Sequence, residues 1–315
     1  MASADVVVIG SGVVGMTTAL SLAEAGCSVT VLTAHRPSET TSARAGALWG
    51  PYLVSDDRVL RWSLLTLREV GSLGADAGVQ FVGGYEASRI EMSPPAWLHN
   101  LPGYAVLAPE RIPDGFVAGW TYSAPIFEMP VYLRYLQQRL NDLKVRTEML
   151  TRPLRGIREA MAEADAVINC AGLGARRLVP DPEVTASWGL LVQVENPGIE
   201  PGFFSDYPED AEPTYYIAHS DHVILGGCLL DEEPDSRQAV ADMAARIRAR
   251  CAAIEPRLEQ ARTLHQQSAL RPVRSQVRLE REVHDDTVVI HNYGHGGSGV
   301  TLSWGCARDV TALLG

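Results

Sequence analysis

Three glycines near the start of the chain have the spacing of a dinucleotide-binding turn. Gly10, Gly12 and Gly15 form a Gly-x-Gly-x-x-Gly motif. In such a motif the first glycine permits a tight turn, the second lets a pyrophosphate approach the backbone, and the third lets a helix lie close to a strand. The amide groups at the start of that helix then face the phosphates. The motif therefore predicts a dinucleotide cofactor, with Val13 and Val14 in the same turn.

The elements that must position this motif are predicted on both sides of it. Residues 6–9 are a β-branched run typical of a buried strand, apolar residues at helical spacing follow over 16–23, and residues 29–32 form the next strand. The acidic residue that usually closes this second strand and binds a ribose is missing, since the stretch reads Thr33-Ala34-His35-Arg36. This argues against NAD. Whether Arg36 binds an extra phosphate or pairs with a diphosphate stays open.

The pattern of a strand followed by a glycine turn returns twice. It recurs at residues 165–174, where the nucleotide-binding fold is expected to resume, and at 288–299, which leads into a helix over 302–314. Residues 40–52 are rich in small and hydroxyl side chains and also suit a close approach to a flat ligand. Between these regions, residues 60–130 predict a largely β domain. Further elements are predicted as a helix over 131–143, strands at 190–194, 214–217 and 223–225, and a helix at 239–253.

Composition and charge exclude several classes of protein. The 315 residues are 46% hydrophobic, which suits a globular chain. The net charge of −11 argues against binding to nucleic acid or to an anionic membrane, because both are negatively charged. No apolar run is long enough to span a bilayer, and no secretory signal is recognised at the N-terminus. The five cysteines are widely spaced, which predicts reduced thiols in a cytoplasm and no zinc or disulfide framework.

Five segments of the chain resemble the D-amino acid oxidase family, which includes the D-aspartate oxidases. They fall in the family's order from end to end, and His291-Asn292-Tyr293-Gly294-His295-Gly296-Gly297 is the most specific part. The segments are residues 8–15, 46–52, 167–172, 271–274 and 291–299. The resemblance implies an α/β fold, in which a Rossmann-like FAD-binding domain is interleaved with an α+β substrate domain built on a large antiparallel sheet. The FAD-binding domain is expected at residues 1–50, 131–187 and 271–315, and the substrate-binding domain at 51–130 and 188–270.

The resemblance also implies a reaction. In this family a hydride passes from the α-carbon of a D-amino acid to N5 of a flavin, here expected to be held non-covalently as FAD. The imino acid hydrolyses to a 2-oxo acid and ammonia, and dioxygen reoxidises the flavin to give hydrogen peroxide. Because the cofactor carries the chemistry and the protein orients the substrate, no nucleophile, metal or other catalytic side chain is expected. The expected partners are a D-amino acid and dioxygen, with homodimer formation left open.

The family's substrate-binding residues match three positions. Arg271 matches the arginine that binds the substrate carboxylate, for which a planar guanidinium offers two parallel hydrogen bonds. Tyr215 matches the tyrosine that helps to hold the carboxylate, with Tyr216 as the alternative register. The carbonyl of Gly297 matches the acceptor of the substrate amine.

The cofactor-binding residues implied by the family come from the glycine-rich regions and the segments between them. Backbone donors to the flavin ring are expected from Gly296 to Thr301. The predicted set is Gly10, Gly12, Val13, Val14, Gly15, His35, Arg36, Thr40, Thr41, Ser42, Gly46, Ala47, Leu48, Leu150, Ala171, Gly296, Gly297, Ser298, Gly299, Val300 and Thr301.

Two departures from the family's animal members bear on the choice of substrate. Ala211 stands where they carry a lid tyrosine, and Gly50 stands where they carry a glutamine. Both changes favour bulkier neutral side chains and faster product release. A D-aspartate or glycine oxidase is the alternative, with His219 or Arg274 as candidates for selecting acidic substrates. An NAD(P)-dependent dehydrogenase and a flavin-binding protein without turnover are the alternatives from other classes.

Overall fold

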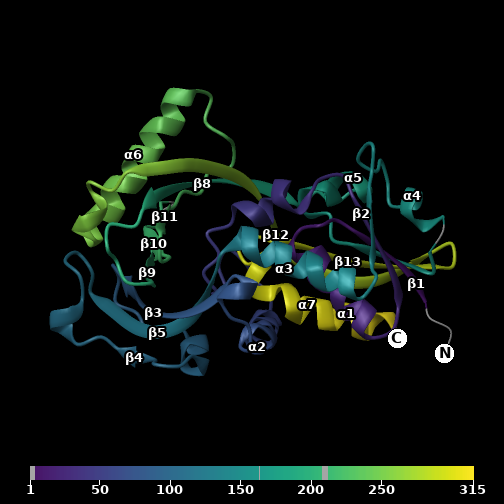
Figure 1. Cartoon of the computed structure of the whole chain (residues 1–315), viewed down its shortest axis with the longest axis horizontal. Helices are drawn as coiled ribbons and strands as arrows, with labels where there is room; N and C mark the ends of the chain where they lie inside the picture. The colour runs from purple at the N-terminus through teal and green to yellow at the C-terminus, as the bar shows by residue number, and fades with distance from the viewer. Residues whose placement is uncertain (1–3, 163, 208–211) are drawn as a thin grey trace. The chain divides into compact units, whose positions relative to one another are not determined.

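The computed structural model describes residues 4–162, 164–207 and 212–315, and the chain folds into two compact units (Figure 1). Unit 1 comprises Met1–Val79, Phe127–Ala186 and Arg271–Gly315, and unit 2 comprises Gln80–Ile126 and Ser187–Leu270. Residues 51–79 were expected in the substrate-binding domain but lie in unit 1. The reason is that α2 (Val59–Val70) packs along α7 (Gly299–Leu314).

Unit 1 is built on a mostly parallel sheet with the strand order β12-β13-β7-β1-β2-β6. Each neighbouring pair from β13 to β6 is parallel, whereas β12 is antiparallel to β13. Strand β12 enters this unit at Arg271. The strands are β1 (Asp5–Ile9), β2 (Ser28–Thr33), β6 (Arg146–Met149), β7 (Ala166–Asn169), β12 (Thr263–His284) and β13 (Thr287–His295).

Helices cover both faces of this sheet (Figure 1). Val7 and Ile9 of β1 pack in a cluster with Ala160 of α4 and Leu178 of α5. Because side chains alternate along a strand, Val6 and Val8 face the other side, where α1 packs against β1 and α7 against β13. The remaining helices of unit 1 are α1 (Val13–Glu24), α3 (Met129–Asp142), α4 (Arg158–Met161) and α5 (Ala175–Leu178), with 3₁₀ turns at Pro37–Glu39, Thr41–Arg44, Ala75–Ala77 and Gly172–Gly174.

The prediction of a largely β segment over residues 60–130 is wrong at its start, where α2 lies. The buried face of α2 carries Ser63 and Thr66 as well as Trp62 and Val70, so its apolar periodicity is broken. Both hydroxyls have hydrogen-bond partners: Ser63 Oγ donates to the carbonyl of Val59 at 2.8 Å, and Thr66 Oγ1 accepts from the amide of Gly305 in the closely packed α7 at 3.2 Å. A side chain at residue 305 would meet the backbone of Trp62 at 2.3 Å, so this contact requires glycine.

Unit 2 contains a mainly antiparallel sheet with the order β4-β5-β3-β9-β10-β11-β8, in which β3 and β9 form a parallel pair. The strands are β3 (Val79–Ser88), β4 (Ala105–Val106), β5 (Ala118–Phe127), β8 (Thr185–Glu195), β9 (Gly202–Tyr207), β10 (Tyr215–Ala218) and β11 (His222–Gly226). Helix α6 (Arg237–Ile254) is capped by Ser236, whose hydroxyl accepts a hydrogen bond from the amide of Ala239. The 3₁₀ turns of this unit are Ala96–Asn100, Pro109–Arg111 and Pro256–Leu258.

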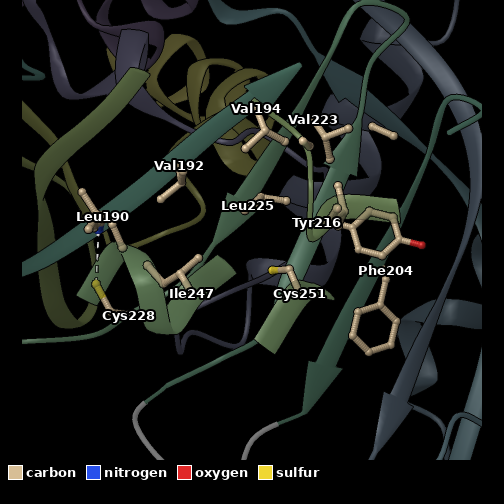
Figure 2. Close-up of a cluster of buried hydrophobic side chains, with 14 of the residues drawn as sticks. Leu190, Val192, Val194, Phe204, Tyr216, Val223, Leu225, Cys228, Ile247 and Cys251 are labelled. Atoms are coloured by element: carbon tan, nitrogen blue, oxygen red, sulfur yellow. Dashed lines mark hydrogen bonds between the residues drawn. The ribbon is translucent and has the colours of Figure 1, made fainter. Parts of the chain in front are cut away.

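The core of unit 2 lies between α6 and the sheet (Figure 2). Alternate residues of β8 and β11 supply one side, and Ile247 and Cys251 of α6 supply the other. The strand residues are Leu190, Val192, Val194, Val223 and Leu225. This period-two pattern explains why the predicted strands were found from the sequence.

A buried carboxyl group in unit 2 makes the stability of the protein depend on pH. Glu86 of β3 accepts a hydrogen bond from Trp120 Nε1 at 2.7 Å. Burial raises the pKa of Glu86 to about 7, and hydrogen bonds from Trp120 and Tyr122 lower it only in part. Between about pH 4.5 and pH 7 the folded protein therefore keeps a proton on Glu86 that the unfolded chain has already released.

A Glu86→Gln variant is expected to gain stability over the wild type as the pH rises through this window, by about 3 kcal/mol once above it. The amide keeps an acceptor for Trp120 and carries no charge to desolvate. Urea unfolding at about pH 5 and about pH 8 measures the difference. Glu110→Gln, at an exposed position, is the control. An equal gain at both pH values would contradict the titration of Glu86.

Candidate active site

The glycines of the first turn hold β1, α1 and the segment after β7 in close contact. Gly10 has φ +110°, and a Cβ there would lie 2.6 Å from the carbonyl oxygen of Cys170. A Cβ on Gly15 would lie 2.0 Å from the carbonyl oxygen of Gly10. Both positions therefore require glycine for the backbone packing of the protein itself, in addition to any ligand.

The start of α1 presents backbone donors. The amide of Val13 donates to Ser42 Oγ at 3.0 Å, and the amide of Met16 begins the helical ladder by donating to the carbonyl of Gly12. The amides of Val14 and Gly15 lie between these two and have no acceptor within the helix. The positive end of the helix is thus open to an anionic group, as the motif predicts.

The end of β2 carries hydroxyl groups where many dinucleotide-binding folds carry an acid. Ser11 Oγ and Thr33 Oγ1 both approach the carbonyl oxygen of His35, at 2.8 Å and 2.7 Å. The amide of Arg36 donates to the carboxylate of Glu39 at 2.8 Å, and Thr40 Oγ1 donates to the carbonyl of Pro37. Local hydrogen bonds therefore fix the backbone of residues 33–40.

Other predicted cofactor residues are placed beside these elements. The amide of Leu150 donates to the carbonyl of Thr33 at 2.7 Å, which sets Leu150 at the end of β2. Ala171 lies next to Gly10, with 3.5 Å between its Cα and the Cβ position of that glycine. Ala47 has φ +57° and its carbonyl accepts from the amide of Phe127. A cofactor contact remains a prediction for all of these residues, and for Thr41, Gly46 and Leu48 as well.

The second glycine loop leads into α7. The amide of Gly296 (φ +56°) donates to the carbonyl of Pro272 at 2.9 Å, and Leu302 is the first residue to donate within the helix, to Ser298. The amides of Gly299, Val300 and Thr301 therefore have no acceptor within the helix. The Cβ position of Gly299 lies 3.9 Å from Val14 Cγ2, so the first turns of α1 and α7 are adjacent (Figure 1).

The imidazole of His295 shows that this region fits a polar ligand. Its Nε2 is buried and has no hydrogen-bond partner among the residues that the structure describes. Burial lowers the pKa of His295 to about 4, so the ring is neutral at pH 7. An unpaired buried polar atom is costly unless a ligand or water satisfies it. Together with two adjacent helix starts, it fits a dinucleotide such as FAD.

Arg271 lies directly before the residues that pair with the glycine loop. Val273 is opposite His295 in the β12–β13 ladder, and the carbonyl of Pro272 accepts from Gly296. These backbone contacts place the half-buried Arg271 one residue from the contact with Gly296, at the start of the second glycine loop within unit 1. The structure therefore brings together the predicted carboxylate-binding residue and the predicted amine acceptor.

Each nitrogen of the Arg274 guanidinium donates to a protein group. Its Nε donates to Asp181 at 3.1 Å, and its two terminal nitrogens donate to Glu183 and to the carbonyl of Gln276. The buried hydroxyl of Tyr293 also donates to Asp181, at 2.8 Å. Burial alone would raise the pKa of Asp181, but the Tyr293 hydrogen bond and the charge of Arg274 hold it below its usual value.

Sequence reasoning missed the Asp181–Tyr293 pair and the role of Tyr52. A sequence signal that bears on the pair is the number of charged residues on β12, where Arg278 also donates to the Tyr293 hydroxyl at 2.7 Å. In the sequence Tyr52 is only the last residue of the stretch 40–52, and no individual role was predicted for it. The structure places its ring against Gly297, whose Cβ position is 2.5 Å from Tyr52 Cδ1.

Within unit 2, Tyr215 lies across Gly226, the last residue of β11, and Gly227, which follows it. The Cβ position of Gly226 is 2.2 Å from Tyr215 Cζ, and that of Gly227 is 2.8 Å from Tyr215 Cε1. Arg250 of α6 donates to the carbonyl of Gly227 at 2.7 Å and to Glu212 at 2.6 Å, so the backbone of Gly227 beneath the Tyr215 ring is itself held by hydrogen bonds. Ala211, the expected lid position, lies outside the described residues.

The comparisons with known proteins agree along the whole chain. The family model described as FAD dependent oxidoreductase (DAO) matches residues 5–313. A D-amino-acid oxidase of Rubrobacter xylanophilus is 41% identical over 99% of this chain and 96% of its own. A human D-aspartate oxidase is 30% identical over 100% of this chain and 95% of its own.

The structural neighbours share the fold. A glycine oxidase from Geobacillus kaustophilus superimposes with a TM-score of 0.78 at 17% identity, covering 99% of this chain and 95% of that one. No helix in the described part of the chain is both long and apolar enough to cross a membrane. The full-length family match and the close relatives establish that the chain belongs to the DAO family of FAD-dependent oxidoreductases.

Proposed function

We propose that the chain is a D-amino-acid oxidase that deaminates neutral D-amino acids to 2-oxo acids, with release of ammonia and hydrogen peroxide. Two relatives named D-amino-acid oxidase, at 41% and 38% identity over nearly the full length, support this activity. The observation that carries it is the placement of Arg271 beside the second glycine loop. The family match favours FAD over the nicotinamide cofactor that was left open above.

The protein's own residues bind and orient in this proposal. The first turns of α1 and α7 and the unpaired His295 Nε2 would hold FAD, which when bound supplies the acceptor for the two electrons of the substrate. Arg271 binds the substrate carboxylate through its planar fork, and the carbonyl of Gly297 accepts from the amine. Because both the carboxylate and the amine of the substrate are held, the direction of the α-hydrogen on the same carbon is fixed.

Two features support neutral rather than acidic substrates. Each nitrogen of Arg274 already donates to a protein group, and the carboxylates of Asp181 and Glu183 already pair with its charge, which disfavours a second substrate carboxylate there. Burial lowers the pKa of His219 to about 4, so this side chain offers no charge at pH 7. Within its own unit nothing lies within 4 Å of the Cβ position of Gly50, which leaves room for a bulky side chain.

The experiment is hydrogen peroxide production by the FAD-loaded protein against paired D- and L-amino acids, including D-aspartate and glycine. We expect activity with neutral D-isomers only. A preference for D-aspartate or glycine would favour the alternative in the same class. Absence of activity with flavin bound would overturn the oxidase proposal and leave the family assignment in place.

The close packing of the Tyr215 ring on Gly226 yields a further prediction. In a Gly226→Ala variant the new methyl group would overlap the Tyr215 ring, at 2.2 Å from Cζ, and would displace it. If Tyr215 helps to hold the substrate carboxylate, KM for a D-amino acid rises about tenfold while FAD content is unchanged. Steady-state kinetics and the visible flavin absorbance measure both quantities.

The matched control is Gly83→Ala in β3 of the same unit, where nothing lies within 4 Å of the Cβ position. The Tyr215→Phe variant should share most of the effect of Gly226→Ala, and the double variant should add little. Normal kinetics in Gly226→Ala would exclude Tyr215 from the substrate site and favour Tyr216 as the tyrosine that helps to hold the carboxylate.

The cellular setting follows from the sequence argument alone. We propose a cytoplasmic location, because five widely spaced cysteines suit a reducing compartment. Dioxygen is the proposed electron acceptor, in keeping with relatives named as oxidases. Homodimer formation stays a prediction.

A further inference from the structure

Ser298 occupies the N-cap position directly before α7, but its side chain makes no capping hydrogen bond to that helix. Its side chain is fully buried, and no backbone amide of α7 donates to its hydroxyl. Instead Ser298 Oγ accepts from the amide of Tyr52 and donates to the carbonyl of the same residue at 2.7 Å. One hydroxyl therefore satisfies both backbone groups of a residue in a distant segment.

Thr301 repeats this arrangement three residues later, on the same face of the helix. Its buried Oγ1 accepts from the amide of Gly50 at 3.1 Å and donates to the carbonyl of Gly50 at 3.0 Å. Gly50 and Tyr52 are alternate residues of one short segment. The two hydroxyls thus bind the backbone amide and carbonyl groups of the segment Gly50–Leu53 at two positions.

The segment Gly50–Leu53 lies very close to the glycine loop. A Cβ on Gly296 would be 1.9 Å from the carbonyl oxygen of Leu53, and a Cβ on Gly297 would be 2.5 Å from Tyr52 Cδ1. Leu53 itself has φ +52°, a left-handed conformation that costs free energy in a non-glycine residue. Such a conformation persists only where the surrounding contacts enforce it.

We propose that Ser298 and Thr301 are positioning residues whose hydroxyls fasten Gly50–Leu53 across the glycine loop and thereby fix Tyr52 against Gly297. This role is separate from the backbone donation to FAD expected of residues 296–301, because the side chains point to Gly50 and Tyr52. The consequence for the reaction rests on the proposed function. If Gly50–Leu53 is no longer held, the ring of Tyr52 no longer packs against Gly297, whose carbonyl is the proposed acceptor of the substrate amine, and substrate binding weakens.

The test compares Thr301→Val, which keeps the shape and removes the hydroxyl, with Thr301→Ser, which keeps the hydroxyl. Hydrogen exchange of the FAD-loaded protein is followed in peptides that cover Gly50–Leu53. We expect exchange about tenfold faster or more in Thr301→Val and in Ser298→Ala, and near wild type in Thr301→Ser. Flavin content is measured in each variant to confirm that the comparison concerns loaded protein.

Kinetics supply the second readout. In Thr301→Val we expect KM for a neutral D-amino acid to rise about fivefold with little change in kcat, and Thr301→Ser to restore it. Unchanged exchange in both Thr301→Val and Ser298→Ala would overturn the fastening role. Faster exchange with an unchanged KM would overturn its consequence for substrate. If the wild type itself lacks oxidase activity, the proposed function fails while the exchange result still decides the fastening role.

Discussion

An Arg271→Leu variant is expected to bind FAD as the wild type does and to show KM for a neutral D-amino acid about 100-fold higher. The guanidinium makes two charge-assisted hydrogen bonds to a carboxylate, and leucine can make none. Arg271 lies on β12 beside the loop, whereas the predicted FAD donors are backbone groups of α1 and α7, so the loss should concern the substrate alone. KM and flavin content of the purified variant measure the two effects.

Two further substitutions make this result specific. Arg271→Lys keeps the charge and loses the planar fork, so its KM should lie between those of the wild type and Arg271→Leu. Arg281→Leu removes an exposed arginine from the same strand and should leave KM unchanged. An Arg271→Leu variant with normal KM would exclude Arg271 from the substrate site. A variant that has lost its flavin would instead give Arg271 a structural role.

The parts of the fold that were predicted from the sequence are those with a strong local pattern. The strand, glycine turn and helix over residues 5–24 follow from a β-branched run, fixed glycine spacing and helical periodicity, all within one short stretch. The same holds for β13 and α7 at the end of the chain. In both places the signal and the structure it specifies lie in consecutive residues.

The parts that could not be predicted depend on contacts between distant residues. The buried face of α2 includes the polar residues Ser63 and Thr66, which break its apolar periodicity, and Thr66 accepts from Gly305 only because that glycine lets α7 approach. Asp181 and Tyr293 meet across 112 positions of sequence, and no periodicity reports such a pair. The hydroxyls of Ser298 and Thr301 likewise act on a segment nearly 250 residues away, so the sequence suggested only their backbone role.

A Gly15→Ala variant is expected to lose nearly all bound FAD. The new methyl carbon would lie 2.0 Å from the carbonyl oxygen of Gly10, an overlap with backbone that no side-chain rotation can relieve. Overpacking costs about 1–3 kcal/mol even where neighbours can adjust. Here α1 must move away from the turn that it completes, so the amides of Val14 and Gly15 leave their positions and FAD affinity should fall about 100-fold or more.

The control for this variant is Gly156→Ala in the same unit, where nothing lies within 4 Å of the Cβ position and FAD should be retained. Titration of both apoproteins with FAD, followed by flavin fluorescence, compares their affinities. Circular dichroism separates a displaced α1 from general unfolding, because only the latter removes most of the helical signal. If Gly15→Ala bound FAD as tightly as the wild type, close packing of α1 on the Gly10 turn would not be what holds the cofactor. The start of α7 and His295 would then have to carry that binding.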